Sequence, residues 1–153
     1  MDTSSPASNS HDVNAGAWRH MQAWFLLVAV LAIHVFDEAM TGFLGFYNPL
    51  VLTIRSRVPW FPMPTFTFRI WLAGLALLVL VLVSLGPAVY RGATGTRIAS
   101  WALATIMLLN GLGHLGGSFY FQRWLPGTTS APLLLAASIL LARRTAQRVP
   151  AAA

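Results

Sequence analysis

Four stretches of apolar residues, separated by short polar segments, dominate the chain. They cover residues 21–43, 68–90, 98–121 and 131–142, and the last is the shortest. A helix needs roughly 20 mostly apolar residues to cross a bilayer. The pattern therefore predicts an all-α fold, an integral membrane four-helix bundle in up-and-down order.

The segment between the first two stretches has a different pattern. Residues 47–67 contain several aromatic residues and four prolines, and a proline removes a backbone donor that lipid cannot replace. We expect a short interfacial helix near residues 49–57, followed by a Pro/aromatic loop at the headgroup level. If this loop covers a binding site, Trp60 and Phe61 are candidate substrate-binding residues.

The two ends of the chain are polar or short. Residues 1–20 are predicted to be a disordered tail, because the first seventeen or so are small and polar with little to bury. The transmembrane domain is expected over residues 21–148, with a C-terminal tail at 149–153.

Composition and charge agree with a membrane protein. The chain is 56% hydrophobic and 9% charged, whereas a soluble domain carries about 25% charged residues. It has no cysteine, which excludes disulfides and thiolate metal sites. All basic residues are arginines that flank the apolar stretches rather than forming a basic stripe, so nucleic acid is not an expected partner.

The arginines also indicate an orientation. Six lie near the N-terminal flank, the second connection and the C-terminus, and four lie on the opposite side. Positive residues favour the cytoplasmic side. We therefore expect a multi-pass protein of the cell membrane with both termini in the cytoplasm.

Five polar residues inside the apolar stretches are candidates for chemistry. His34 lies three residues before Asp37 and four before Glu38, so the three share a helix face. Asn110 and His114 are four residues apart in the third stretch. The first and third helices run in the same direction, and these groups reach a similar depth, in the outer half of the bilayer.

Acidic residues inside a membrane need a neutralising partner. An acid at mid-bilayer costs roughly 2.5 kcal/mol or more, so a histidine, a metal ion or a shared proton is expected beside the acids. Histidine and carboxylate ligands suit zinc, iron or manganese. The candidate metal ligands are His34, Asp37, Glu38 and His114. The first three are also candidate catalytic residues, and Asn110 is a candidate for substrate binding.

Simpler interpretations of the same residues stay open. The acids lie near the end of their stretch, where they could be solvated at the interface. Each histidine could bond a backbone carbonyl, and Asn110 could join two helices.

The chain resembles a known family in three places. "HVFDE" at residues 34–38, "NGLGHL" at 110–115 and "WLPG" at 124–127 resemble, in this order, the landmarks of the HXXEE-domain family of small bacterial membrane proteins with four helices. Asp37 stands where the family motif has its first glutamate, which shortens the reach of that carboxylate by one methylene. The resemblance implies a four-helix fold and a role for the five polar residues, but no particular reaction.

Three classes of function fit these observations. The first is a membrane-embedded enzyme, such as an isomerase, cyclase or hydrolase, that uses the His/Asp/Glu cluster on a lipophilic small molecule. The alternative is a small proton-coupled transporter in which Asp37 or Glu38 exchanges a proton for a cation. The third is a structural subunit. The bilayer is a partner in each case, and four helices leave a thin core that favours a homo-oligomer.

Overall fold

The computed structural model describes residues 6–93 and 95–147, and the elements in these ranges are helices without any strand. The helices are α1 (Pro6–Thr41), α2 (Phe43–Arg57), α3 (Phe68–Ser84), α4 (Gly86–Arg91), α5 (Thr96–Tyr120) and α6 (Ala131–Gln147). Within the described ranges, three stretches are long and apolar enough to cross a membrane: Asn14–Thr41, Phe68–Arg91 and Thr96–Tyr120. The predicted all-α, multi-pass membrane architecture is therefore confirmed.

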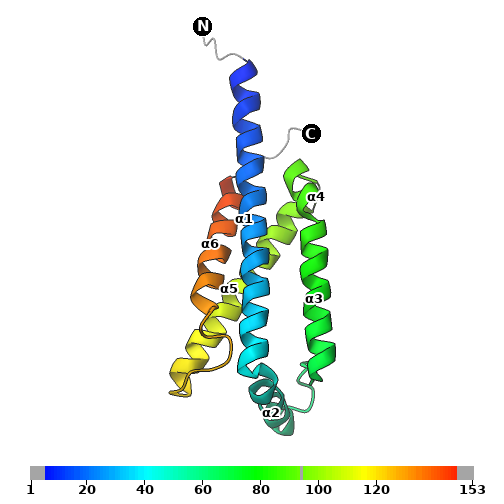
Figure 1. Ribbon diagram of the computed structural model, residues 1–153, viewed down its shortest axis with the longest axis vertical. Coiled ribbons are helices and arrows are strands. Elements are labelled where there is room, and N and C mark those ends of the chain that lie inside the picture. The colour runs from blue at the N-terminus through cyan, green and yellow to red at the C-terminus, as the bar shows by residue number, and fades with distance from the viewer. Residues whose placement is uncertain (1–5, 94, 148–153) are drawn as a thin grey trace.

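The helix α1 is the central element of the bundle. Figure 1 shows α6 on one side of α1 and α3 on the other, with α5 crossing behind α1 and α2 turning across the lower end. The main contacts of α6 are with α1 and α5, and its Leu134 and Leu141 are fully buried. Because α6 has 17 residues, it is about 25 Å long, shorter than a typical hydrocarbon core. A complete fourth span stays a prediction.

The start of α1 differs from the sequence-based expectation. A disordered tail was predicted through residue 20, but α1 begins at Pro6. Proline suits the first turn of a helix, and no further proline follows within α1. His20 is fully buried, so the packed bundle begins before residue 21. Residues 1–5 and the predicted boundary at 148/149 lie outside the described residues.

A tight turn separates α1 from α2. Gly42 has a φ of 76°, a left-handed conformation that glycine adopts without strain. The interfacial helix consequently begins at Phe43 rather than near residue 49, and Pro49 lies inside it.

Residues 58–67 follow α2 and are hydrogen-bonded to side chains of that helix. We call this segment the Pro/aromatic strap. Asn48 donates to the carbonyl of Phe66 at 2.9 Å and accepts from its amide at 3.1 Å. The Tyr47 hydroxyl donates to the carbonyl of Pro64 at 2.9 Å. A tyrosine hydroxyl is already protonated at neutral pH, and burial raises the pKa of Tyr47 further, so this hydroxyl is a donor.

A buried polar cluster joins three helices toward the end of the bundle opposite α2. His20 Nε2 of α1 lies 3.0 Å from Ser100 Oγ of α5 and 3.2 Å from Thr145 Oγ1 of α6. Each hydroxyl donates its hydrogen to a carbonyl of its own helix at 2.8 Å. Both therefore accept from His20 by sharing the single hydrogen on Nε2, which makes this histidine a structural link between helices.

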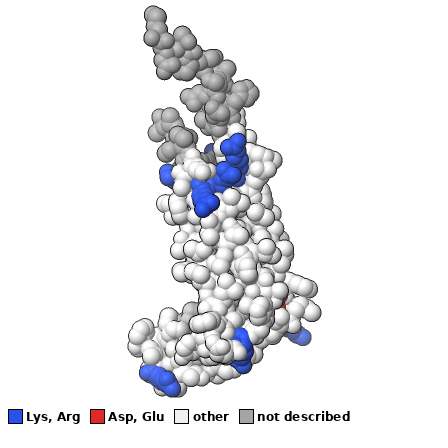
Figure 2. Space-filling view, turned by 90° about the vertical axis from the view of Figure 1, so that its left-hand side faces the viewer, with Lys and Arg blue, Asp and Glu red and all other residues white. Residues whose placement is uncertain are grey.

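The charged residues mark the two ends of the molecule. Figure 2 shows arginines gathered toward the upper and lower ends of one face, with an uncharged middle between them. Arginines at both edges of an apolar band are typical of a protein that crosses a bilayer, because their side chains reach the headgroups.

The close approach of α5 and α6 depends on Gly111. A Cβ atom at Gly111 would lie 2.9 Å from Leu135 Cδ2 and 3.2 Å from the carbonyl oxygen of Ala131, whereas one at Gly113 would meet nothing within 4 Å. Gly111→Ala should therefore destabilise the protein by about 1–3 kcal/mol relative to Gly113→Ala. Thermal unfolding in detergent, followed by tryptophan fluorescence, measures the difference. Equal midpoints for the two variants would contradict the close packing.

Candidate metal centre

Two histidines and one glutamate converge in the lower part of the bundle. His34 and Glu38 lie one turn apart on α1, and His114 comes from α5. Glu38 Oε1 is 3.1 Å from His114 Nε2 and 3.7 Å from His34 Nε2. One ligand atom from each residue lies within 4.8 Å of the other two. The structure therefore brings together His34 and Glu38 of the first predicted span and His114 of the third.

The cluster is shielded from solvent. The side chains of His34, Glu38 and His114 are 0%, 6% and 11% exposed. His34 lies seven residues before Thr41, the last residue of α1, which corresponds to about 10 Å along the helix axis. The three side chains are therefore inside a membrane-spanning helix pair, close to the end where α2 lies.

Asp37 is not part of this group. Its Oδ2 atom accepts hydrogen bonds from the backbone amide of Ser130 at 3.0 Å and from the Ser130 hydroxyl at 2.7 Å. Ser130 directly precedes α6, and the N-terminus of a helix favours a negative charge. The carboxylate of Asp37 thus caps α6 and ties it to α1.

Ser130 fixes the state of the His34 ring. Its hydroxyl has one hydrogen, which the 2.7 Å bond to the Asp37 carboxylate uses in preference to the 3.3 Å contact with the Gly127 carbonyl. The hydroxyl oxygen lies 2.8 Å from His34 Nδ1 and must accept there. We therefore assign the hydrogen of a neutral His34 to Nδ1.

The other ring nitrogen of His34 is then left with a bare lone pair. Nε2 is buried and makes no hydrogen bond of normal geometry. The Asn110 side chain lies beside the ring, and the Glu38 oxygen that faces Nε2 is also an acceptor. An unpaired polar atom in an apolar interior is costly. Two buried acceptors that face each other call for a proton or a metal ion between them.

The loop between α5 and α6, residues 121–130, covers the cluster. Gly127 has a φ of 81°, and a Cβ atom there would lie 2.7 Å from His114 Cε1 and 3.1 Å from Glu38 Cγ. Thr128 bonds Ser118 of α5 at 2.6 Å through their hydroxyls. Only a residue without a side chain lets the backbone approach the two ligand groups so closely.

Sequence reasoning missed the roles of two residues in this loop. Gly127 was expected only as part of the "WLPG" resemblance, and no role in the site was predicted for Ser130. The polar run "TTS" between Pro-Gly and an apolar helix is the signal that could have indicated buried hydrogen bonds.

The remaining predicted site residues lie in different places. The side chain of Asn110 is near His34, one turn before His114 on α5. Trp60 is 81% exposed in the Pro/aromatic strap, and Phe61 is its neighbour. Substrate binding by Asn110, Trp60 and Phe61 stays a prediction.

Comparison with known proteins gives one family. A family model described as "Protein of unknown function with HXXEE motif" matches residues 24–141, which include His34, Glu38, His114 and the covering loop. No curated protein and no solved structure matches the chain.

The tight fit of Gly127 against the cluster can be tested with a matched glycine. Gly127→Ala introduces a left-handed alanine, which costs about 1–2 kcal/mol, and also a clash with His114. Gly42→Ala carries the strain alone, because a Cβ there meets nothing within 4 Å. Thermal unfolding in detergent should show a clearly larger loss for Gly127→Ala. If the two variants lose the same stability, the loop does not press on the cluster.

Proposed function

The chain belongs to the family of proteins of unknown function with an HXXEE motif, and we propose that it is a membrane-embedded, metal-dependent enzyme that acts on a lipophilic substrate. His34, Glu38 and His114 hold one divalent ion in this proposal. The observation that carries it is the buried, unpartnered Nε2 of His34, which faces the Glu38 carboxylate.

The three donors fit a divalent ion. Ligand atoms around a tetrahedral zinc ion, each about 2.0–2.1 Å from the metal, are about 3.3 Å apart. The contacts of 3.1 and 3.7 Å from Glu38 Oε1 to His114 and His34 are close to this spacing, and all three ligand atoms lie within 4.8 Å of one another. Two imidazoles and one carboxylate are also the protein ligands of one class of catalytic zinc site, where a fourth position stays open. Iron and manganese accept the same donors.

Asp37 and Ser130 support the ligands without binding the ion. A histidine that binds a metal through one nitrogen usually donates the other N–H to a fixed acceptor, which sets its tautomer and ring orientation. The Ser130 hydroxyl is that acceptor for His34, and Asp37 holds the hydroxyl in place. These two residues are therefore positioning residues, whereas Glu38 would contact the ion directly.

Hydrolysis is the reaction that this donor set favours. A bound divalent ion would supply a polarised water or carbonyl group at the open position. In the reaction, a water molecule adds its hydroxyl to one side of the cleaved bond and its proton to the other. The substrate is lipophilic because the site lies within membrane-spanning helices. Isomerase or cyclase chemistry would use the same carboxylate as an acid–base group.

The transporter alternative has less support. Asp37, one of the two acids that it could use, is bonded to the amide and hydroxyl of Ser130. A transporter mechanism also assigns no role in ion exchange to His34 and His114, the two histidines beside Glu38.

The proposed orientation has both termini in the cytoplasm and α6 as a fourth, short span. In that orientation the start of α1 and the end of α6 share one side (Figure 1). The cluster then lies in the outer leaflet, close to the headgroups that α2 contacts.

Metal binding is the direct test of the site. We expect the detergent-purified chain to bind about one zinc ion, measured by elemental analysis after removal of free metal and by calorimetric titration. Glu38→Gln and His34→Gln should lose stoichiometric binding. Ser130→Ala should weaken binding by about 10–100-fold, because it releases the tautomer of His34 but leaves all three ligands.

His20→Gln is the matched control. It removes a buried histidine of the same helix that bonds Ser100 and Thr145 instead of the cluster, so zinc binding should persist. All variants are compared as monodisperse protein. Equal zinc content in wild type and the Glu38 and His34 variants would overturn the proposal.

A further inference from the structure

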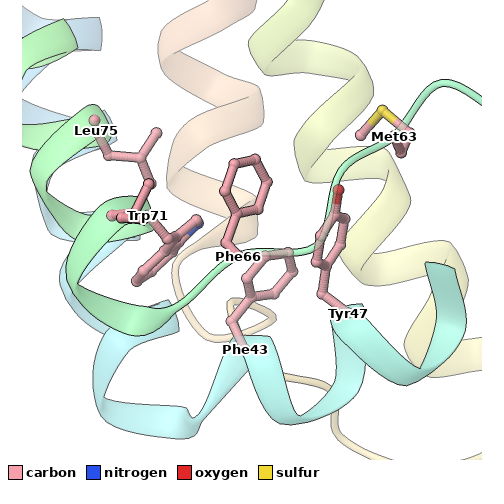
Figure 3. A pocket seen from close by; sticks show the side chains of 8 residues that line it. Phe43, Tyr47, Met63, Phe66, Trp71 and Leu75 are labelled. Carbon is pink, nitrogen blue, oxygen red and sulfur yellow. The ribbon is translucent and has the colours of Figure 1, made fainter. Parts of the chain in front are cut away.

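An apolar groove lies beside the candidate metal centre. It has a volume of about 310 Å³ and is lined by Phe43, Tyr47, Met63, Phe66, Ile70, Trp71, Gly74 and Leu75. Figure 3 shows Phe43 and Tyr47 rising from α2 toward Phe66 of the Pro/aromatic strap and Trp71 of α3. The groove is thus walled by α2, α3 and the strap.

The polar groups around the groove are already engaged. The Tyr47 hydroxyl donates to the carbonyl of Pro64, and Asn48 is bonded to both backbone groups of Phe66. Arg55 of α2 donates to the carbonyl of Met63. The side chains facing the groove therefore offer mostly hydrocarbon and aromatic surface, which suits a hydrocarbon chain rather than a polar headgroup.

One residue connects the groove with the metal centre. The ring centroid of Phe43 is 5.9 Å from that of His114 and 5.8 Å from that of Trp71. Phe43 therefore lines the groove and also contacts a residue of the cluster. A ligand that fills the groove ends against Phe43, and its polar head reaches His114 when that ring rotates aside.

We propose that the groove binds the alkyl chain of a single-chain, lipid-like substrate and directs its polar head to the cluster of His34, Glu38 and His114. The inference rests on the proposed function and names its substrate class. A volume of about 310 Å³ is at the lower limit of small-molecule pockets, so it accommodates one chain rather than a bulky ring system. The apolar wall supplies affinity, and the cluster supplies the contact with the reacting group.

Gly74 offers a way to fill the groove. A Cβ atom at this position would meet nothing within 4 Å, and its helical backbone tolerates a side chain. Gly74→Leu therefore places a branched side chain in the groove without touching the cluster. Gly116→Leu is the matched control, since a Cβ at Gly116 also meets nothing within 4 Å, but Gly116 does not line the groove.

The experiment uses palmitic acid with a photoreactive diazirine on its chain, added to the full-length chain in detergent with and without zinc. We expect labelled peptides from residues 43–75, with labelling that increases when zinc is bound, because the carboxylate head meets the ion. Gly74→Leu should reduce this labelling several-fold, whereas Gly116→Leu should leave it at the wild-type level. Zinc binding, measured in the same samples, should be equal in all three proteins.

The outcomes separate this inference from the proposed function. If zinc binds but Gly74→Leu labels as strongly as wild type, or labelling spreads over α5 and α6, the groove is not the chain site and the inference is overturned alone. If wild type binds no zinc, the proposed function fails and the inference fails with it.

Discussion

The hydrogen-bond chain from Asp37 through Ser130 to His34 is the constraint on which the rest of the site depends. The Ser130 hydroxyl has one hydrogen and two acceptors within reach, and it donates to the Asp37 carboxylate at 2.7 Å. This choice forces His34 to donate through Nδ1 and leaves Nε2 bare inside the bundle. The same carboxylate caps α6, so the bond that sets the ring also joins α1 to α6. The packing of α6 against α1 and the orientation of the His34 ring therefore depend on the same bonds between Asp37 and Ser130.

This chain explains why two acids stand side by side in a membrane helix. Consecutive residues of a helix point about 100° apart, so Asp37 and Glu38 reach different neighbours. Asp37 faces the start of α6, where backbone donors and the helix dipole stabilise its charge. Glu38 faces two imidazoles. The pair is not a single dyad with one shared proton. Asp37 joins two helices, and Glu38 lies in the cluster with both histidines.

The sequence predicted the helices and the meeting of His34, Glu38 and His114, because both follow from local periodicity and depth. It could not predict that Asp37 would bind Ser130, 93 positions away. The position of a residue on a helix face gives the direction of its side chain, but it does not identify the residue that the side chain meets. Ser130 directly precedes α6, and nothing in the sequence indicates that its hydroxyl binds Asp37 of α1 rather than its own helix. The position of Gly127 against His114 depends on how the loop folds over the bundle, and no spacing in the sequence encodes that.

The central claim is the protonation pattern of His34, and nitrogen-15 NMR of the histidine-labelled chain tests it most directly. The account predicts that metal-free His34 carries its hydrogen on Nδ1, that Nε2 has the resonance of an unprotonated imidazole nitrogen, and that zinc shifts this Nε2 signal together with that of His114. A His34 that is protonated on Nε2 in the metal-free protein and unaffected by zinc would contradict the account.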